Sequence, residues 1–151
     1  MAQPIRIFLS HDAADTGTAR DIQRQLALLA QPGETVFWDP RTIATEAVRT
    51  HAKAFLEKAD LFVAVLSMNY TDKPDVFWEA TQAISTQVVR PALQIVRVQA
   101  REAAVPAALL PYPTALPIGE TIENQGIARD RQLYRAAQTI LSVLPAAPQR
   151  N

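Results

Sequence analysis

The chain contains no cysteine and only four glycines among its 151 residues. The lack of cysteine excludes disulfide scaffolds, zinc ribbons, thiol nucleophiles and iron–sulfur clusters. Phosphate-binding loops need several glycines close together, whereas Gly17, Gly33, Gly119 and Gly126 are scattered along the chain. Any nucleotide must therefore be bound by a site of a different kind.

Net charge and long apolar runs are also missing. Lys plus Arg is 15 and Asp plus Glu is 15, so no basic excess attracts nucleic acid or an anionic membrane. No stretch of about 18 apolar residues occurs, and residues 1–12 lack the pattern of a signal peptide. The absence of cysteine suits a reducing compartment. We therefore expect a soluble cytoplasmic protein that binds neither nucleic acid nor membranes.

What is present is an alternation of strand and helix patterns. Apolar runs predict strands at residues 5–10, 35–38, 61–66 and 93–98, and apolar spacings of three and four predict helices at 14–29, 48–59, 75–87 and 130–144. Residues 67–74 are polar and turn-like. Residues 100–117 carry four prolines and predict an irregular loop with a short final strand near 114–116.

This order of elements predicts an α/β fold, a flavodoxin-like doubly wound sheet of about five parallel strands with helices on both faces. The length suits a single domain, residues 1–145, and residues 146–151 after Pro145 are expected to be a flexible tail or the start of a linker. Ligands of such sheets bind beyond the carboxyl ends of the strands. The informative segments are therefore residues 10–15, 39–46 and 67–79.

These segments carry a resemblance to a known family. Residues 6–12 read RIFLSHD, residues 36–39 read VFWD and are followed by Arg41 and Ile43, and residues 59–67 read ADLFVAVLS. Asn69 and Tyr70 follow, and Glu79 lies nine residues after Tyr70. In this order and spacing the segments resemble the TIR (Toll/interleukin-1 receptor) domains, in particular bacterial ones, over roughly residues 5–87.

The resemblance implies an activity and a site. In catalytic members of the family, a glutamate on the third helix is required to cleave NAD+ between nicotinamide and ribose, a role that the resemblance assigns to Glu79. NAD+ is then a substrate, and neither a cofactor nor a metal is required. The resemblance places other side chains around the substrate: Ser10 and His11 at the first strand end, Phe37, Trp38, Asp39 and Arg41 beside the so-called BB loop, and Ser67 and Tyr70 as a third wall. It also implies other TIR domains as partners, in a homo-oligomer or filament, and bacterial immune or anti-phage signalling.

Each residue also has an interpretation without function. On a helical wheel, Glu79 lies about 130° from the apolar face of Phe77, Ala80 and Ile84, so an exposed surface charge is one explanation. Trp38 is explained by packing, and His11 by a hydrogen bond within a loop. Asp12 and Asp15 are typical helix-capping acids.

Other functions stay open beside NAD+ cleavage. A non-catalytic TIR scaffold is favoured by Glu46, where a glycine is usual in the family, and by Asp75, where enzymatic members commonly have tryptophan. A nucleoside deoxyribosyltransferase also uses a glutamate on a related sheet. A phosphorylation receiver is set aside, because the third strand ends in Leu66-Ser67 without an aspartate and no lysine follows Lys73. The sequence does not distinguish a linear from a cyclic product.

Overall fold

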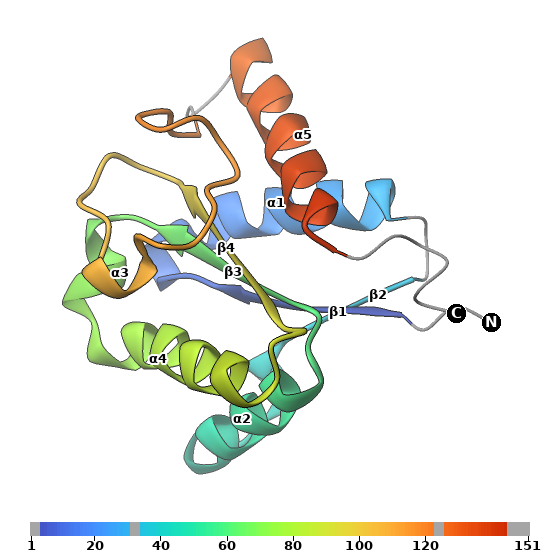
Figure 1. Ribbon diagram of the computed structural model, residues 1–151. Helices are drawn as coiled ribbons and strands as arrows, with labels where there is room; N and C mark the ends of the chain where they lie inside the picture. The colour runs from blue at the N-terminus through green and yellow to red at the C-terminus, as the bar shows by residue number, and fades with distance from the viewer. Residues whose placement is uncertain (1–3, 31–33, 123–125, 145–151) are drawn as a thin grey trace.

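The computed structural model describes residues 4–30, 34–122 and 126–144. The described residues contain four parallel strands in the order β2-β1-β3-β4. Helices cover both faces of this sheet (Figure 1). The strands are β1 (Ile5–Ser10), β2 (Thr35–Phe37), β3 (Leu61–Leu66) and β4 (Gln94–Gln99), and the helices are α1 (Thr16–Leu29), α2 (Val48–Lys58), α3 (Met68–Asp72), α4 (Pro74–Val89) and α5 (Ile127–Ser142).

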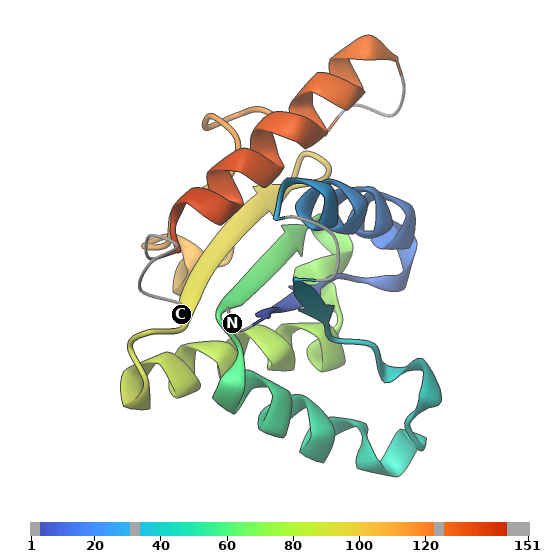
Figure 2. The same ribbon diagram turned by 90° about the vertical axis from the view of Figure 1, so that its right-hand side faces the viewer.

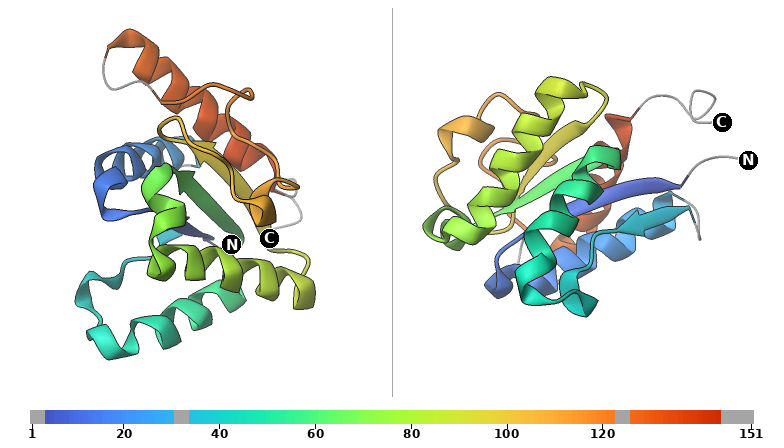
Figure 3. Two further views of the ribbon diagram at one scale, coloured as in Figure 1. Left: turned by 90° about the vertical axis from the view of Figure 1, so that its left-hand side faces the viewer. Right: turned by 90° about the horizontal axis from the view of Figure 1, so that it is seen from below.

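The sheet separates two hydrophobic cores. α1 and α5 lie on one face, and α2 and α4 lie on the other (Figure 2). Seen from below, α2 and α4 run side by side across their face (Figure 3). Side chains alternate along β1, so Ile7 and Leu9 enter the core under α1 and α5, whereas Phe8 enters the opposite core. Ser10, two residues after Phe8, therefore points to the side of α4.

The fold confirms the α/β class, the parallel sheet and the helices on both faces, but the strand number is different. Within the described residues, the sheet has four strands where about five were predicted. The expected final strand near residues 114–116 is reduced to one parallel bridge between Arg97 and Thr114. Pro113 and Pro117 have no N–H to donate to a neighbouring strand, so regular pairing does not extend in either direction.

A second correction concerns residues 67–74, where Met68–Asp72 form the short helix α3 instead of a turn. α3 begins after Ser67, and its Tyr70 side chain is fully buried in the core under α4. Burial of one large side chain stabilises a helical turn that a polar sequence by itself does not predict. Pro74 then occupies the first turn of α4, where its missing N–H costs nothing.

Two further sequence expectations concern the ends of the chain and membranes. The predicted tail, residues 146–151, lies outside the described residues. In the ranges that the structure covers, no helix combines the length and the apolar character needed to cross a membrane.

Candidate active site

Three hydrogen-bonded side chains join the end of β1 to α3 and α4. Ser10 Oγ lies 2.7 Å from Glu79 Oε1 and 2.8 Å from the Tyr70 hydroxyl. The serine hydroxyl has one proton, and when it donates this proton to Glu79, the Tyr70 hydroxyl must donate to Ser10. Ser10 and Tyr70 are fully buried, whereas Glu79 is half-buried. Of the three residues, only Glu79 therefore keeps contact with solvent.

The position of Glu79 on α4 differs from the surface position that the helical wheel suggests. The fully buried residues of α4 are Ala80 and Ala83. At about 100° per residue, Glu79 lies only about 40° from Ala83, one turn away on the same side. The two small alanines let the helix approach the sheet closely, and this brings the glutamate to the end of β1.

The electrostatics of the site follow from this burial. Burial raises the pKa of Glu79 to about 7, and the hydrogen bond from Ser10 opposes that rise. Near neutral pH the carboxyl therefore exists in both protonation states, as a group that exchanges protons during a reaction requires. Burial also raises the pKa of Tyr70 well above its usual value. The phenol consequently stays protonated and remains a donor to Ser10.

The loop after β1 contains another acid, Asp12, which is almost fully buried. Its carboxylate is 1% exposed and accepts a hydrogen bond from the backbone N–H of Ala14 at 2.9 Å. The Nζ of Lys73 lies 3.0 Å from its other oxygen. The Ala14 N–H and the Lys73 ammonium hold the pKa of Asp12 below its usual value, although burial opposes them. Asp12 thus combines the predicted capping role with an ion pair to the residue preceding α4.

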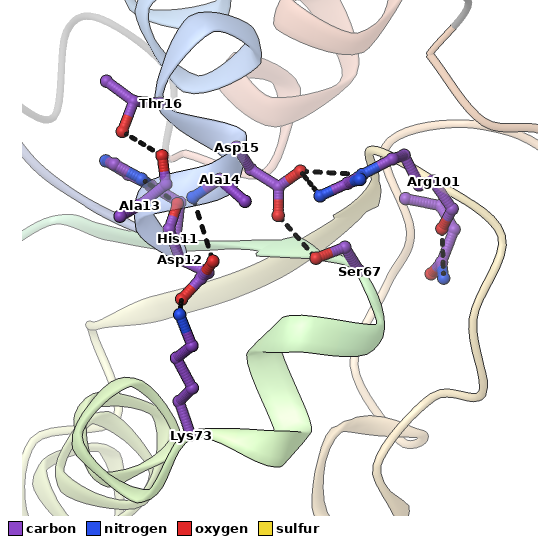
Figure 4. A network of polar contacts seen from close by, with 10 residues as sticks. His11, Asp12, Ala13, Ala14, Asp15, Thr16, Ser67, Lys73 and Arg101 are labelled. Carbon is purple, nitrogen blue, oxygen red and sulfur yellow. Dashed lines mark hydrogen bonds and ion pairs between the residues drawn. The ribbon is translucent and has the colours of Figure 1, made fainter.

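Asp15 lies at the start of α1 and connects three strand ends. One of its carboxylate oxygens accepts a 2.5 Å hydrogen bond from Ser67, directly after β3. The other faces Arg101, after β4, with contacts of 3.1 Å to Nε and 2.9 Å to Nη2. In Figure 4 the Asp12 carboxylate points toward Lys73, whereas that of Asp15 points toward Ser67 and Arg101. The capping role expected for Asp15 is not its main contact, because its side chain makes no cap hydrogen bond to α1.

A comparison with protein-family models matches residues 7–126 to the TIR domain model. This chain belongs to the TIR domain family. The match extends beyond the residues 5–87 on which the sequence resemblance rested, into the loop after β4. A comparison with curated proteins finds no match.

The predicted BB-loop residues of this TIR domain are engaged with the protein itself. Arg41 forms a two-point ion pair with Asp39, with N–O distances from 2.7 to 3.1 Å. This pairing lowers the pKa of Asp39 to about 2. The side chain of Arg41 is 82% exposed, so an anion approaching this loop meets a cation that is already paired but accessible.

The two aromatic residues at the end of β2 face opposite cores. Phe37 packs beneath α1 and α5, whereas Trp38 packs on the side of α2 and α4. The Trp38 ring stacks on Phe8 with centroids 5.2 Å apart, and Phe55 lies 5.7 Å away. These contacts give Trp38 a packing role. The structure therefore does not bring Phe37 and Trp38 together as one aromatic surface.

The remaining predicted site residues, His11 and Ser67, make hydrogen bonds within and between the loops that follow the strands. His11 is half-buried, and its Nδ1 lies 2.9 Å from the carbonyl of Asp12. Ser67 is almost fully buried and donates to Asp15. A cavity of about 370 Å³ lies elsewhere, beside β4 and the following loop, with Arg97, Glu102 and Glu120 in its lining. The structure thus joins Ser10, Tyr70 and Glu79 in one cluster, whereas the other predicted residues make their contacts elsewhere.

Sequence reasoning missed the roles of Lys73 and Arg101. Each is one basic residue in a polar loop, and nothing in the local pattern shows that a buried acid lies opposite. A signal was nevertheless present, because Asp12 and Asp15 follow a buried strand within a few residues. Acids that become buried in a fold require a cation or several N–H donors.

Proposed function

We propose that this TIR domain is an NAD+ glycohydrolase in which Glu79 is the catalytic residue. The observation that carries the proposal is the half-buried carboxyl of Glu79, bonded to Ser10 at the carboxyl ends of the strands. This is the edge at which parallel sheets bind their ligands. Membership of the TIR family supports the proposal. In catalytic members of the family, a glutamate at the place that Glu79 occupies on α4 is required for NAD+ cleavage.

The reaction needs little beyond one carboxylate. The bond between C1′ of the ribose and the pyridinium nitrogen breaks, and its electron pair stays on the nitrogen. Nicotinamide therefore leaves as a neutral base and requires no general acid, unlike the alcohol that leaves in ordinary glycoside cleavage. The ribosyl centre becomes an oxocarbenium-like cation, which ionised Glu79 stabilises.

The second half of the reaction returns a nucleophile to C1′. Water adds to the cation and loses a proton, giving ADP-ribose. A carboxyl with a pKa of about 7 is well matched to accept that proton near neutral pH. Attack by a nucleophile within the same molecule would give a cyclic product by the same first step. In both cases Ser10 orients the carboxylate and Tyr70 orients Ser10.

Self-association is part of the proposal. Arg41 and Glu46 are exposed in the segment between β2 and α2, which corresponds to the BB loop of the family. We propose that this loop of one copy completes the pocket beside Glu79 of the next, in a homo-oligomer or filament. The proposed setting is cytoplasmic bacterial immune signalling, including defence against phages.

Product analysis of NAD+ by chromatography tests the activity. Wild-type protein, at concentrations that produce oligomers, is expected to release nicotinamide together with ADP-ribose or a cyclic product. Glu79→Gln keeps the size of the side chain but cannot become an anion, and it should lower the rate by roughly 10³-fold. Glu57→Gln, an exposed change on α2, is the matched control and should retain full activity.

The same experiment discriminates between functions. If wild type and Glu79→Gln are equally inert as oligomers, the glycohydrolase proposal is wrong and the scaffold is favoured. The scaffold has an observation of its own, because Asp75 and Arg49 form an ion pair on the surface at a position where enzymatic members commonly have tryptophan. Base exchange on a nucleoside without NAD+ cleavage would instead identify a deoxyribosyltransferase.

A further inference from the structure

The ion pair between Asp12 and Lys73 connects the two elements whose side chains meet in the candidate site. Asp12 follows Ser10 by two residues, and Lys73 directly precedes α4, the helix that carries Glu79. Asp12 Oδ1 and Lys73 Nζ are 3.0 Å apart. This contact and the bond between Ser10 and Glu79 therefore join the same two segments, the end of β1 and the first half of α4.

Of the two segments that the ion pair joins, the loop after β1 is held by more buried polar contacts than the start of α4. Asp12 accepts the N–H of Ala14, and Asp15 is bonded to Ser67 and Arg101. These contacts tie the loop to the ends of β3 and β4 (Figure 4). The polar contacts at the start of α4 are weaker. Asp75 pairs with Arg49 of α2, but both side chains are exposed, and such pairs contribute little to stability. Lys73, the N-cap residue of α4, makes no side-chain cap hydrogen bond. Its ammonium instead crosses to Asp12.

We propose that the Asp12–Lys73 ion pair is a positioning device that holds the start of α4 against the end of β1 and so keeps Glu79 on Ser10. The proposal deepens the NAD+ glycohydrolase function and rests on it for its catalytic consequence. Asp12 and Lys73 are positioning residues, since they act on the reaction through Glu79. Without the pair, the first turns of α4 move outward and the Glu79 carboxyl becomes more exposed to water.

The proposal makes a prediction that a purely electrostatic role does not make. Lys73→Met removes a positive charge, which through charge alone would raise the pKa of Glu79. Asp12→Asn removes a negative charge, which through charge alone would lower it. Positioning predicts a fall in both variants, because burial is the largest cause of the raised pKa and burial is lost in each.

The test is an NMR titration of the Glu79 carboxyl in full-length protein with ¹³C-labelled glutamate, assigned with Glu79→Gln. The wild-type midpoint is expected near 7. Both Lys73→Met and Asp12→Asn should lower it by about one pH unit or more. Lys73→Arg keeps the ion pair and should restore the wild-type midpoint. Shifts in opposite directions, or no shift in Lys73→Met, would overturn the proposal.

A matched control separates positioning from general loss of stability. Asp21 pairs with Arg129 at 2.6 Å between α1 and α5, on the face of the sheet away from Glu79. Asp21→Asn breaks an interhelical ion pair and should leave the Glu79 midpoint unchanged. If it lowers the midpoint as much as Lys73→Met does, the effect is general destabilisation and the proposal is wrong. Lys73 is 55% exposed, so Lys73→Met tests the proposal even if Asp12→Asn does not fold.

Kinetics give the catalytic consequence. Misplacing Glu79 should lower kcat for NAD+ cleavage by about tenfold to a hundredfold while KM changes less. If Lys73→Met lowers the titration midpoint of Glu79 but leaves kcat unchanged, the catalytic part of the proposal is wrong. The titration needs no activity, so an inert wild type with the expected midpoint shifts would count against the glycohydrolase function alone.

Discussion

At the scale of single residues, the candidate site depends on one carboxyl group in two environments. Glu79 is half-buried against the end of β1, yet it keeps contact with solvent. Burial disfavours the anion, whereas the Ser10 hydroxyl favours it. The balance brings a carboxylic acid into the neutral pH range, where small changes in its surroundings have a large effect on its ionisation.

The pH dependence of the proposed NAD+ cleavage follows from this balance. In the proposed mechanism the anion of Glu79 is the active form, and the pKa of this carboxyl is about 7. We therefore expect kcat to rise by about tenfold between roughly pH 6 and 8 and then to level off. Initial rates across this range measure the profile, with circular dichroism showing that the protein stays folded. A rate that falls as pH rises through 7 would show that the protonated form is the active one.

At the scale of elements, the segments that follow β1, β3 and β4 are joined by buried polar contacts. Asp15 at the start of α1 binds Ser67 after β3 and Arg101 after β4. A carboxylate that is 3% exposed requires such partners, since a buried unpaired charge is strongly destabilising. The contacts hold the carboxyl ends of these strands in one arrangement around Ser10.

Removal of the Ser67 hydroxyl tests this connection. Ser67→Ala leaves one buried oxygen of Asp15 without its hydrogen bond, and it should lower the free energy of unfolding by about 1–3 kcal/mol. Thr71→Ala also removes a hydroxyl nearby, but Thr71 is exposed and should change stability by less than about 0.5 kcal/mol. Urea denaturation of both variants measures the difference. Equal effects would mean that the Ser67–Asp15 bond contributes little.

At the scale of the whole molecule, titratable groups act on stability in opposite directions. Asp39 and Asp12 have pKa values below those of free aspartate, so they stabilise the folded state above about pH 3.8 and lose this effect in acid. In the folded protein the pKa of Glu79 is about 7, against 4.5 for a free glutamate side chain. The folded state therefore binds its proton more tightly, and stability falls as pH rises from about 4.5 to 7.

We expect these groups together to give greatest stability between about pH 4 and 4.5. Between about pH 5 and 8 the wild type should lose on the order of 2 kcal/mol, after allowance for the partial exposure of Glu79. Glu79→Gln should remove this loss and leave the decline in acid unchanged. Urea denaturation at a series of pH values measures both the decline in acid and the loss of stability between pH 5 and 8. A wild type that is equally stable at pH 5 and 8 would contradict the raised pKa.

The sequence by itself determined the fold class and the family, and it predicted Glu79 as the catalytic residue. The all-apolar run of β3 indicates a strand covered on both faces, and the apolar spacing of α1 and α2 indicates helices, so both are local information. The strand expected at residues 114–116 was not local information in this sense, because its pairing depends on which N–H groups the prolines remove at a particular register.

Only the tertiary structure decided that Glu79 turns toward Ser10, that Trp38 packs against Phe8, and that Lys73 and Arg101 neutralise buried acids. Each of these contacts joins residues far apart in the chain, and their partners are set by how helices and strands pack, which no local pattern encodes.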